Sequence, residues 1–562
     1  MPKRSREDER TPSPTAKRLR ATADRTDRLS SLSDELLIQI LSFLPIPSLI
    51  TCQRLSRRFH SLAGDSELWK RLYYSRWVWP RARRLANSRH SVSSQKALDY
   101  SPRVSKWLGH SHLMEEGRAT NWKRQYRLRH NWSKGTCRVS EVEVAQPPVP
   151  QMLVKLYAGM VFTADSDSGL RVWSTKRPSC CLASFPFRDA IGKVPGAPTA
   201  LAAAKGSSQD SIEITVGFED GHFMVYEMQT PKLRLVLRLS HAASSEGAVT
   251  AVASSSPYVL MISQHKVLSL YELPWRQIDM STDATLEPPR PVASLTANNI
   301  FAPISLSIRN SASEIVASIA YSFYRVGCGW SLGIQELRLN SDGEHLGSRL
   351  ATTVDSQYGA DLVRLPIDPR RGRRHGSIAH QFSAVSAEPS ILHNEPPTSL
   401  SYSHPYLLSS HADNTLTMYL VVSTSNSLSI KGGRRLWGHT SSVSGVQVSE
   451  RGKAVSVGAR GHDIRIWELE AVASSPFSSQ RALQGDSSVQ VSPENKLRRR
   501  SVGFGIAPVA LDTSCGELRS VFEDITEELS SRDSWIGFDE EQVIVLRERG
   551  VGTQLLECYD FT

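Results

Sequence analysis

Residues 28–75 carry apolar side chains at helical spacing. In LSDELLIQILSFLP, residues 32–45, eight of the fourteen residues are large and apolar. Those with a 3.6-residue period predict an amphipathic helix: Leu32, Leu36, Leu37, Ile40, Leu41 and Leu44. Ser33 is the expected N-cap, and the PIP of 45–47 ends the helix. A second apolar series, Leu49 to Leu62, and a short segment with Leu68 and Trp69 complete a predicted three-helix unit.

The first predicted helix is apolar around most of its circumference. A unit of roughly 45 residues can bury only part of its apolar surface by itself. Two interpretations follow. Either the rest of the chain covers this helix, or a second protein does so in a helix-to-helix interface.

After residue 136 the pattern changes to short alternating strands around tight turns. A strand–turn–strand shape ending in an aromatic residue recurs at 159–174, 213–228, 259–273, 406–421 and 454–469. Such self-similarity predicts a β-propeller with four strands per blade. The pattern favours seven blades, although six or eight remain possible. The seven expected blades are 150–184, 195–240, 245–280, 300–345, 395–430, 436–470 and 500–562. Insertions are expected near 348–398 and 473–500.

Charge divides the 562-residue chain unevenly. The net charge is +11; residues 1–135 hold 28 Lys and Arg against 12 Asp and Glu, or +16, which leaves −5 for residues 136–562. This asymmetry suggests two parts with different partners. We expect four segments: a disordered basic tail (1–27), the helical unit (28–75), a basic helical linker (76–135) and the repeat domain (136–562).

Two basic clusters lie in the predicted tail. Lys3 and Arg4 are separated by twelve residues from Lys17, Arg18 and Arg20. This spacing resembles a bipartite nuclear import signal, and the alternative is a solvated basic tail. The seven cysteines are scattered, which favours a reducing compartment. Because no run of about 18 apolar residues and no apolar leader is visible, we expect neither a membrane span nor a secretory signal. We expect the nucleus and cytoplasm.

The helical segment resembles the F-box. Leucines, an acidic residue, a Leu-Pro stop, a basic pair before an aromatic residue and a Leu-Trp pair follow that family's order, although Ser33 stands where the family usually has proline. The resemblance implies docking to the Skp-type adaptor of a cullin-based ubiquitin ligase. It assigns adaptor binding to Leu32, Glu35, Leu36, Leu37, Ile40, Leu41, Leu44, Pro45 and Leu49.

The segment after the F-box-like unit is similar to the linker of F-box proteins with WD repeats. Trp122, Lys123, Tyr126, Asn131, Trp132 and Gly135 match it. In such proteins the segment joins the F-box to the propeller, and buried Trp and Asn would make it rigid. The alternative, a nucleic-acid-binding basic helix, is less favoured because the aromatic spacing suits a helix-to-sheet joint.

The repeats resemble degenerate WD repeats. Gly438–His439 and Trp467–Glu468 frame one complete repeat. The family places a structural Asp six residues before the strand-end aromatic, a place held by Asp167, Asp220 and Asp413 but by His265 and Gly461 in two blades. Propeller receptors of phosphorylated targets often carry an arginine one residue before this Asp. In this chain that position is occupied by Ser166, Glu219, Gln264, Ala412 and Arg460. Arg460 and Glu219 are the candidate target-binding residues, although the favoured interpretation of Arg460 is an ordinary solvated turn residue.

The sequence shows no catalytic, metal or cofactor motif, so we expect a non-catalytic protein without cofactors. The resemblance as a whole implies a fungal-type substrate receptor of a Skp–cullin–F-box ubiquitin ligase. The F-box would bind the adaptor and, through it, the cullin, and the propeller would hold a protein target whose phosphorylation the sequence leaves open. Two rivals remain: an adaptor-bound scaffold outside the ligase, and a basic propeller protein associated with nucleic acid or chromatin.

Overall fold

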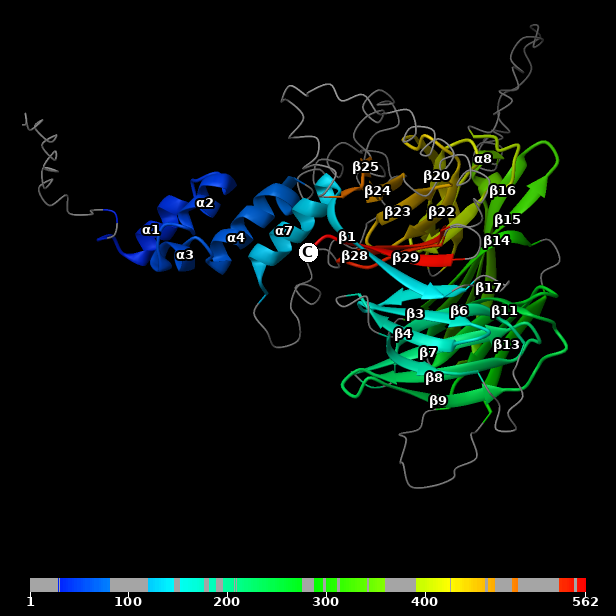
Figure 1. Ribbon diagram of the computed structural model, residues 1–562. Coiled ribbons are helices and arrows are strands. Elements are labelled where there is room, and N and C mark those ends of the chain that lie inside the picture. The colour runs from blue at the N-terminus through cyan, green and yellow to red at the C-terminus, as the bar shows by residue number, and fades with distance from the viewer. Residues whose placement is uncertain are drawn as a thin grey trace, which may run out of the picture. The chain divides into compact units, whose positions relative to one another are not determined.

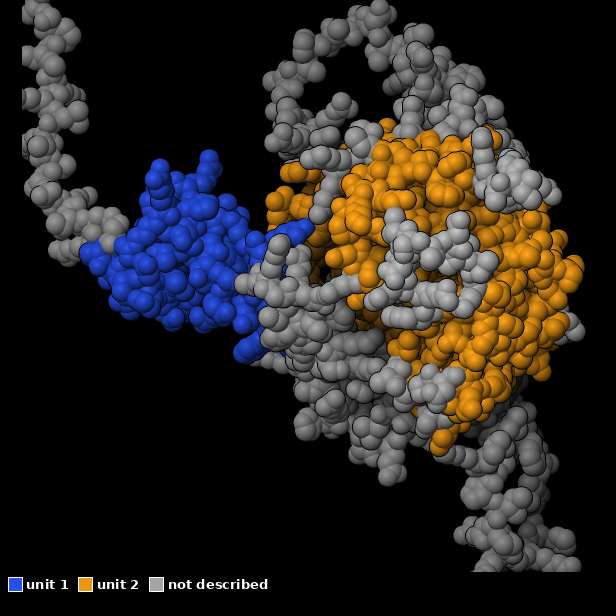
Figure 2. Space-filling model, turned by 90° about the horizontal axis from the view of Figure 1, so that it is seen from below, with its two compact units in different colours: residues 1–80, 117–126 blue, residues 81–116, 127–562 orange. Residues whose placement is uncertain are grey.

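The computed structural model describes most of the chain between Leu29 and Thr562. The described residues are 29, 31–80, 120–145, 152–175, 181–187, 196–206, 208, 210–274, 288–296, 300–310, 314–340, 343–358, 391–424, 426–459, 463–470, 488–493, 535–549 and 553–562. They form two compact units (Figure 2). Unit 1 includes the described residues up to Pro80 and 120–126, and unit 2 those from Arg127 onward.

Unit 1 is a group of short helices. They are α1 (Asp34–Leu41), α2 (Ile46–Cys52), α3 (Arg57–Leu62) and α4 (Ser66–Tyr73), followed by a π-helical turn at Tyr74–Val78. The second apolar series therefore forms two helices and not the single one expected. Ser56 ends the first part and caps the next, because its hydroxyl accepts a hydrogen bond from the Phe59 amide at 3.2 Å.

The core of unit 1 is built from one face of each helix. Its buried side chains are Leu37, Leu41, Leu49, Phe59, Leu62, Leu68, Trp69 and Tyr73. Trp69 donates its indole N–H to the carbonyl of Ala63 at 2.8 Å, so its buried polar atom is satisfied. Asp65 caps α4 by accepting from the amides of Glu67 and Leu68.

Helix α7 (Trp122–Lys134) contributes to both units by its two halves. In unit 1, Trp122 and Tyr126 are buried. Tyr126 packs edge-on against Trp69 at 5.4 Å, and Lys123 donates to the Gln53 side chain at 2.6 Å. In unit 2, Trp132 is buried and Asn131 donates to the carbonyl of Phe561 at 2.8 Å.

Unit 2 is a propeller of seven blades, as expected. Six described sheets have four consecutive antiparallel strands, in chain order from cyan to orange in Figure 1. Blade 1 is β2 (Leu153–Tyr157), β3 (Met160–Asp165), β4 (Gly169–Ser174) and β5 (Cys181–Phe185). Blade 2 is β6 (Pro198–Lys205), β7 (Ser211–Phe218), β8 (Phe223–Gln229) and β9 (Arg234–His241). Blade 3 is β10 (Val249–Ser255), β11 (Tyr258–Ser263), β12 (Val267–Glu272) and β13 (Arg290–Thr296).

The next three blades follow the same plan. Blade 4 is β14 (Phe301–Asn310), β15 (Glu314–Arg325), β16 (Gly329–Asn340) and β17 (His345–Thr352), followed by the short helix α8 (Thr353–Tyr358). Blade 5 is β18 (Ser399–Ser403), β19 (Tyr406–Ser410), β20 (Leu416–Ser423) and β21 (Leu428–Leu436). Blade 6 is β22 (Val443–Val448), β23 (Lys453–Gly458), β24 (Ile464–Glu468) and β25 (Ser488–Gln490). Parts of both expected insertions are thus strands: 348–352 end β17, and 488–490 form β25.

The last blade combines the two ends of the propeller sequence. Its strands are β27 (Ile536–Phe538), β28 (Gln542–Arg549), β29 (Thr553–Asp560) and β1 (Thr136–Ala145), with β26 (Ser492–Pro493) beside β1. β1 pairs antiparallel with β29, and Figure 1 shows the cyan strand beside the red ones. The expected last blade, 500–562, therefore lacked its outer strand, which comes from the start of the repeat domain. This exchange closes the ring and removes two unpaired strand edges.

Every pair of neighbouring blades shares a buried apolar cluster. Blades 1 and 2, for example, meet through Phe162, Val172, Ile214 and Tyr226, and blades 7 and 1 through Val142, Leu156 and Leu546. Corresponding clusters lie at the other five junctions. The strand-end aromatics that mark the repeats fill these junctions, since Tyr226 and Trp467 are fully buried.

Candidate functional site

The outward face of α1 is apolar. Leu36, Ile40 and Phe43 lie at i, i+4 and i+7, so they follow one side of the helix and its continuation. Their exposed fractions are 54%, 43% and 77%. A small unit that leaves a row of large apolar side chains in solvent has the character of a protein-binding surface.

Four more large apolar side chains are exposed in the described part of unit 1: Leu29, Ile50, Leu55 and Trp79. Ile50 of α2 is 49% exposed, and Leu55, in the turn between α2 and α3, is 66% exposed. The five residues Leu36, Ile40, Phe43, Ile50 and Leu55 are called the exposed apolar set below. Sequence reasoning did not choose Phe43, Ile50 or Leu55, because a helix that is apolar all round does not show which side the core takes.

The structure divides the nine expected adaptor-binding residues. Glu35, Leu36, Ile40 and Pro45 are exposed, and Leu32 and Leu44 are partly buried. Leu37, Leu41 and Leu49 are 1%, 2% and 0% exposed. These three cannot reach a partner without opening the core, so the expectation of direct contact is corrected for them.

The start of α1 is held by an ion pair. Arg58 of α3 lies 2.6 Å from the Asp34 carboxylate and donates to the carbonyl of Leu32 at 2.6 Å. Ser33 occupies the N-cap position, but its side chain forms no capping hydrogen bond. Arg58, the second residue of the basic pair before Phe59, therefore orients the start of α1. The expected capping by the Ser33 side chain would have had this role.

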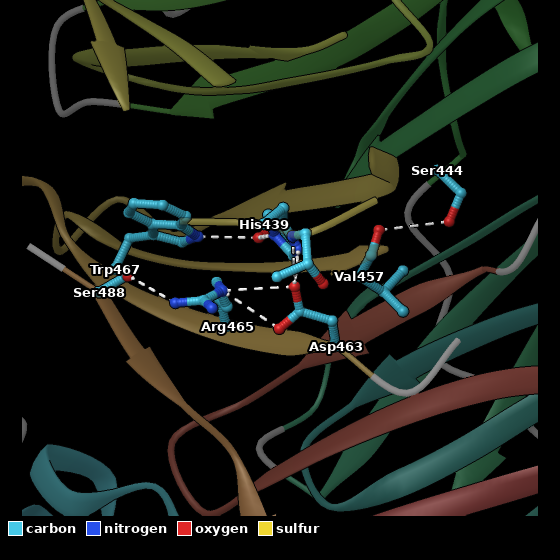
Figure 3. Close-up of polar contacts among 9 residues, drawn as sticks. His439, Ser444, Val457, Asp463, Arg465, Trp467 and Ser488 are labelled. Atoms are coloured by element: carbon cyan, nitrogen blue, oxygen red, sulfur yellow. Dashed lines mark hydrogen bonds and ion pairs between the residues drawn. The ribbon is translucent and has the colours of Figure 1, made fainter. Parts of the chain in front are cut away.

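In the propeller, one blade holds a buried polar network (Figure 3). His439 lies 2.9 Å from the Asp463 carboxylate and 2.6 Å from the Ser456 hydroxyl, which accepts the indole N–H of Trp467 at 2.8 Å. Burial would raise the pKa of Asp463, but the hydrogen bond from His439 and the charges of His439 and Arg465 hold this pKa below its ordinary value. The network links β23 and β24 to the segment that precedes β22.

This network corrects the expected position of the structural aspartate. Gly461 was expected at that place, and the blade seemed to lack the carboxylate. Asp463, four residues before Trp467, supplies it. In blade 1, likewise, buried Asp165 accepts from the turn amides of Asp167 and Ser168 and pairs with Arg171 at 2.8 Å.

Two turn aspartates lie as expected. Asp220 accepts from the amide of His222 at 3.1 Å, and Asp413 accepts from the amide and hydroxyl of Thr415. Such side-chain caps stabilise tight turns. Their role here is structural.

The remaining candidate residues are separated or lie outside the described part of the chain. Glu219 is exposed in the β7–β8 turn, where its amide donates to Ala197. Arg460 lies outside the described residues, as do Lys3, Arg4, Lys17, Arg18 and Arg20. No three potential metal ligands gather among the residues that the structure describes. None of the helices in that part is long and apolar enough to cross a membrane.

Comparison with known proteins agrees with this architecture. Residues 137–562 match the family described as the F-box protein pof12 beta-propeller, and residues 29–75 match the F-box-like family. The F-box protein pof12 of Schizosaccharomyces pombe is 23% identical over 78% of this chain and 84% of its own length. An F-box protein of Saccharomyces cerevisiae is 26% identical over 26% of this chain and 23% of its own length.

Two solved structures match this chain with low TM-scores. BamB from Moraxella catarrhalis is 9% identical with a TM-score of 0.35, covering 75% of this chain and 99% of its own. The WD40 propeller domain of Doa1 is 13% identical with a TM-score of 0.34, covering 75% and 97%. The F-box-like match and the propeller match together span the described units, and the chain belongs to the family of F-box proteins with a pof12-type β-propeller.

Proposed function

We propose that this protein is a substrate receptor of a Skp–cullin–F-box ubiquitin ligase. The F-box binds the Skp-type adaptor, and the propeller binds the target protein. The protein itself carries out no chemistry. It raises the effective concentration of target lysines near the activated ubiquitin, which a separate enzyme transfers.

The exposed apolar set carries the proposal. F-box domains generally bind Skp-type adaptors, and the five side chains of this set belong to the exposed apolar surface that unit 1 offers to one. Burying a Leu or Ile side chain contributes about 1.5–3 kcal/mol. Burial of the five side chains by a partner therefore favours association, against the entropy that association costs.

Substituting Ile40 tests the adaptor interface without disturbing the core. Ile40→Arg places a charge in a desolvated contact, and we expect adaptor affinity to fall by two or more orders of magnitude (about 3 kcal/mol). The measurement is titration of the purified full-length chain with purified adaptor. Ser61→Arg adds the same charge to an exposed position of α3 and is the matched control.

The alternatives give different results in the same experiment. Undiminished adaptor binding by Ile40→Arg would rule out α1 as the docking surface. Binding of adaptor without recruitment of cullin would support a scaffold outside the ligase.

A separate proposal concerns the location of the protein in the cell. The basic clusters at 3–4 and 17–20 direct nuclear import, so that the protein occupies the nucleus as well as the cytoplasm.

A further inference from the structure

Exposed apolar side chains of unit 2 concentrate on one blade. Among the described residues of this unit, nine large apolar side chains are exposed, and five of them belong to blade 4: Phe301, Tyr324, Val326, Leu346 and Leu350. Single exposed apolar residues are ordinary, but a contiguous group marks a binding surface.

Three aromatic side chains of blade 4 contact one another at one end of the ring. Phe301 opens β14, and Tyr324 and Trp330 flank the turn between β15 and β16. The Trp330 ring packs edge-on against both, with centroid distances of 6.0 Å to Phe301 and 5.9 Å to Tyr324. Phe301 is 47% exposed and Tyr324 is 56% exposed. We call Phe301, Tyr324, Val326 and Trp330 the aromatic turn cluster.

The hairpin that carries the cluster is unusually long. β15 and β16 have 12 residues each and remain paired from Glu314 and Asn340 to Arg325 and Gly329, where strands average about 5–6 residues. Val326 at its tip is 88% exposed. Green β14, β15 and β16 lie side by side in Figure 1. The paired backbone fixes the positions from which the side chains of β15 and β16 project, so part of the surface is formed before a ligand binds.

The segment before blade 5 extends this surface. The amide of Trp330 donates to the carbonyl of His393 at 2.9 Å, which brings Leu392, 46% exposed, beside the hairpin. Arg435 donates to the carbonyl of Leu392 at 3.2 Å. Its guanidinium lies 6.0 Å from the ring centroid of Trp437, which is 58% exposed.

The charges around the cluster are positive. The Lys266 ammonium lies 4.8 Å from the centroid of the Phe301 ring, and exposed Arg325 adjoins Tyr324. The three segments that form the surface, 300–302, 323–330 and 391–394, contain no Asp or Glu. The acidic groups next to them are exposed Glu395, which follows the third segment, and Asp413, which pairs with Arg435 at 3.6 Å. A ligand with anionic groups beside an apolar anchor therefore complements this surface.

We propose that the aromatic turn cluster binds a short peptide segment of the target, in which one large apolar side chain is flanked by anionic residues. The inference rests on the proposed receptor function and specifies where and by what chemistry the target is held. The apolar anchor packs against Phe301, Tyr324 and Trp330. The flanking anions interact with Lys266 and Arg325. Aromatic side chains that are partly exposed and preorganised dominate the energy of many interfaces.

Synthetic peptides of 15 residues provide the probe. One series has a central Phe or Leu flanked by Asp and Glu, and a second replaces the carboxylates with phosphoserine, which distinguishes the two sources of negative charge. Controls have Lys flanks or a central Ala. We expect the full-length chain to bind an anionic apolar series and to bind the Lys-flanked and Ala-centred peptides at least about tenfold more weakly.

Substitutions locate the binding. Tyr324→Ala removes an exposed ring and Val326→Asp adds a charge at the tip, and each should weaken peptide binding by about tenfold or more. Leu233→Asp is the matched control. Leu233 is 44% exposed in the β8–β9 turn, at the opposite end of the ring from the cluster. It should bind like the unaltered chain, and all three variants should keep the thermal unfolding midpoint.

Other occupants of the surface predict other outcomes. Absence of binding in both anionic series, equal binding of Lys-flanked peptides, or binding unaffected by Tyr324→Ala and Val326→Asp would overturn the proposal. A concentration-dependent dimer in sedimentation that Val326→Asp dissolves would also overturn it, in favour of a second copy of the chain. Adaptor titration in the same samples separates the two proposals, because loss of peptide binding with intact adaptor binding leaves the receptor function standing.

Discussion

The indole of Trp132 stacks on the ring of Phe561, with centroids 4.1 Å apart and planes 15° from parallel. The two residues are 429 positions apart in the chain. Trp132 also donates its N–H to the carbonyl of Glu540 at 2.9 Å, and the Lys453 ammonium lies 3.9 Å from its ring centroid. The last residues of the chain therefore anchor the second half of α7 to the propeller.

Removing this ring should destabilise unit 2. Phe561 is fully buried, and truncation of a buried Phe to Ala costs about 3–5 kcal/mol. We expect Phe561→Ala to lower the thermal unfolding midpoint of the full-length chain, measured by calorimetry. Thr562→Ala, at the neighbouring partly buried position, is the control. Equal midpoints for both variants would contradict the anchoring role.

The Asp463 network should make blade 6 sensitive to strong acid. The folded-state pKa of Asp463 is lowered, so its stabilising effect is present above the unfolded value of about 3.9 and is lost as the pH falls through the folded value. Asp463→Asn removes this contribution. The variant should unfold at a lower temperature than the unaltered chain at pH 7, and the difference should shrink below about pH 4.

A second titrating element is the stacked pair of His393, in the segment before blade 5, and His411, in the turn after β19. Their rings are 3.8 Å apart and 5° from parallel. Burial, aided by the charge of Arg435 on His393 and by His393 on His411, lowers the pKa of His393 to about 4 and that of His411 to about 3. The unfolded chain protonates near pH 6.5, so stability is complete above that pH and declines as the pH falls towards the folded values.

Replacing His411 by an aromatic residue that does not titrate should reduce the loss of stability at low pH. His411→Phe keeps an aromatic ring for stacking, and its unfolding midpoint should fall less between pH 7 and pH 4 than that of the unaltered chain. His345→Gln, at an exposed position of β17, is the control for loss of a histidine. Parallel pH profiles for His411→Phe and the unaltered chain would show that the pair does not govern acid stability.

Deleting residues 1–20 tests the import proposal. The deletion removes both basic clusters and should shift a fluorescent fusion of the full chain towards the cytoplasm. A second variant, with Lys17, Arg18 and Arg20 replaced by Ala, retains the chain length and should have the same effect. An unchanged nuclear fraction in both variants would leave the tail as a solvated basic segment.

The sequence predicted the helical unit and the seven-bladed propeller, because helical and strand periodicities are local. It could not predict partnerships between distant segments. β1 was assigned to no blade, since its pairing with β29 joins residues more than 400 positions apart. The pattern put the structural position of blade 6 at Gly461, because a fixed spacing from Trp467 does not show which turn residue supplies the carboxylate; Asp463 does so.

The candidate site was predicted in outline only. The all-round apolar pattern of 32–45 identified the F-box but could not distinguish Ile40, which is 43% exposed, from Leu41, which is 2% exposed. Leu41→Ala should therefore cost about 2–5 kcal/mol in unit 1 instead of acting at the interface. The aromatic turn cluster escaped notice because aromatics at strand ends also fit the buried junctions between blades.

Assembly of the ligase tests the central claim most directly. The purified full-length chain is mixed with the Skp-type adaptor and the cullin, and the mass of the eluting complex is measured by light scattering. The account predicts a complex containing one copy of each protein, which Ile40→Arg abolishes and Ser61→Arg preserves. Elution of the chain alone, or with adaptor but without cullin, would contradict the assignment as a ubiquitin-ligase receptor.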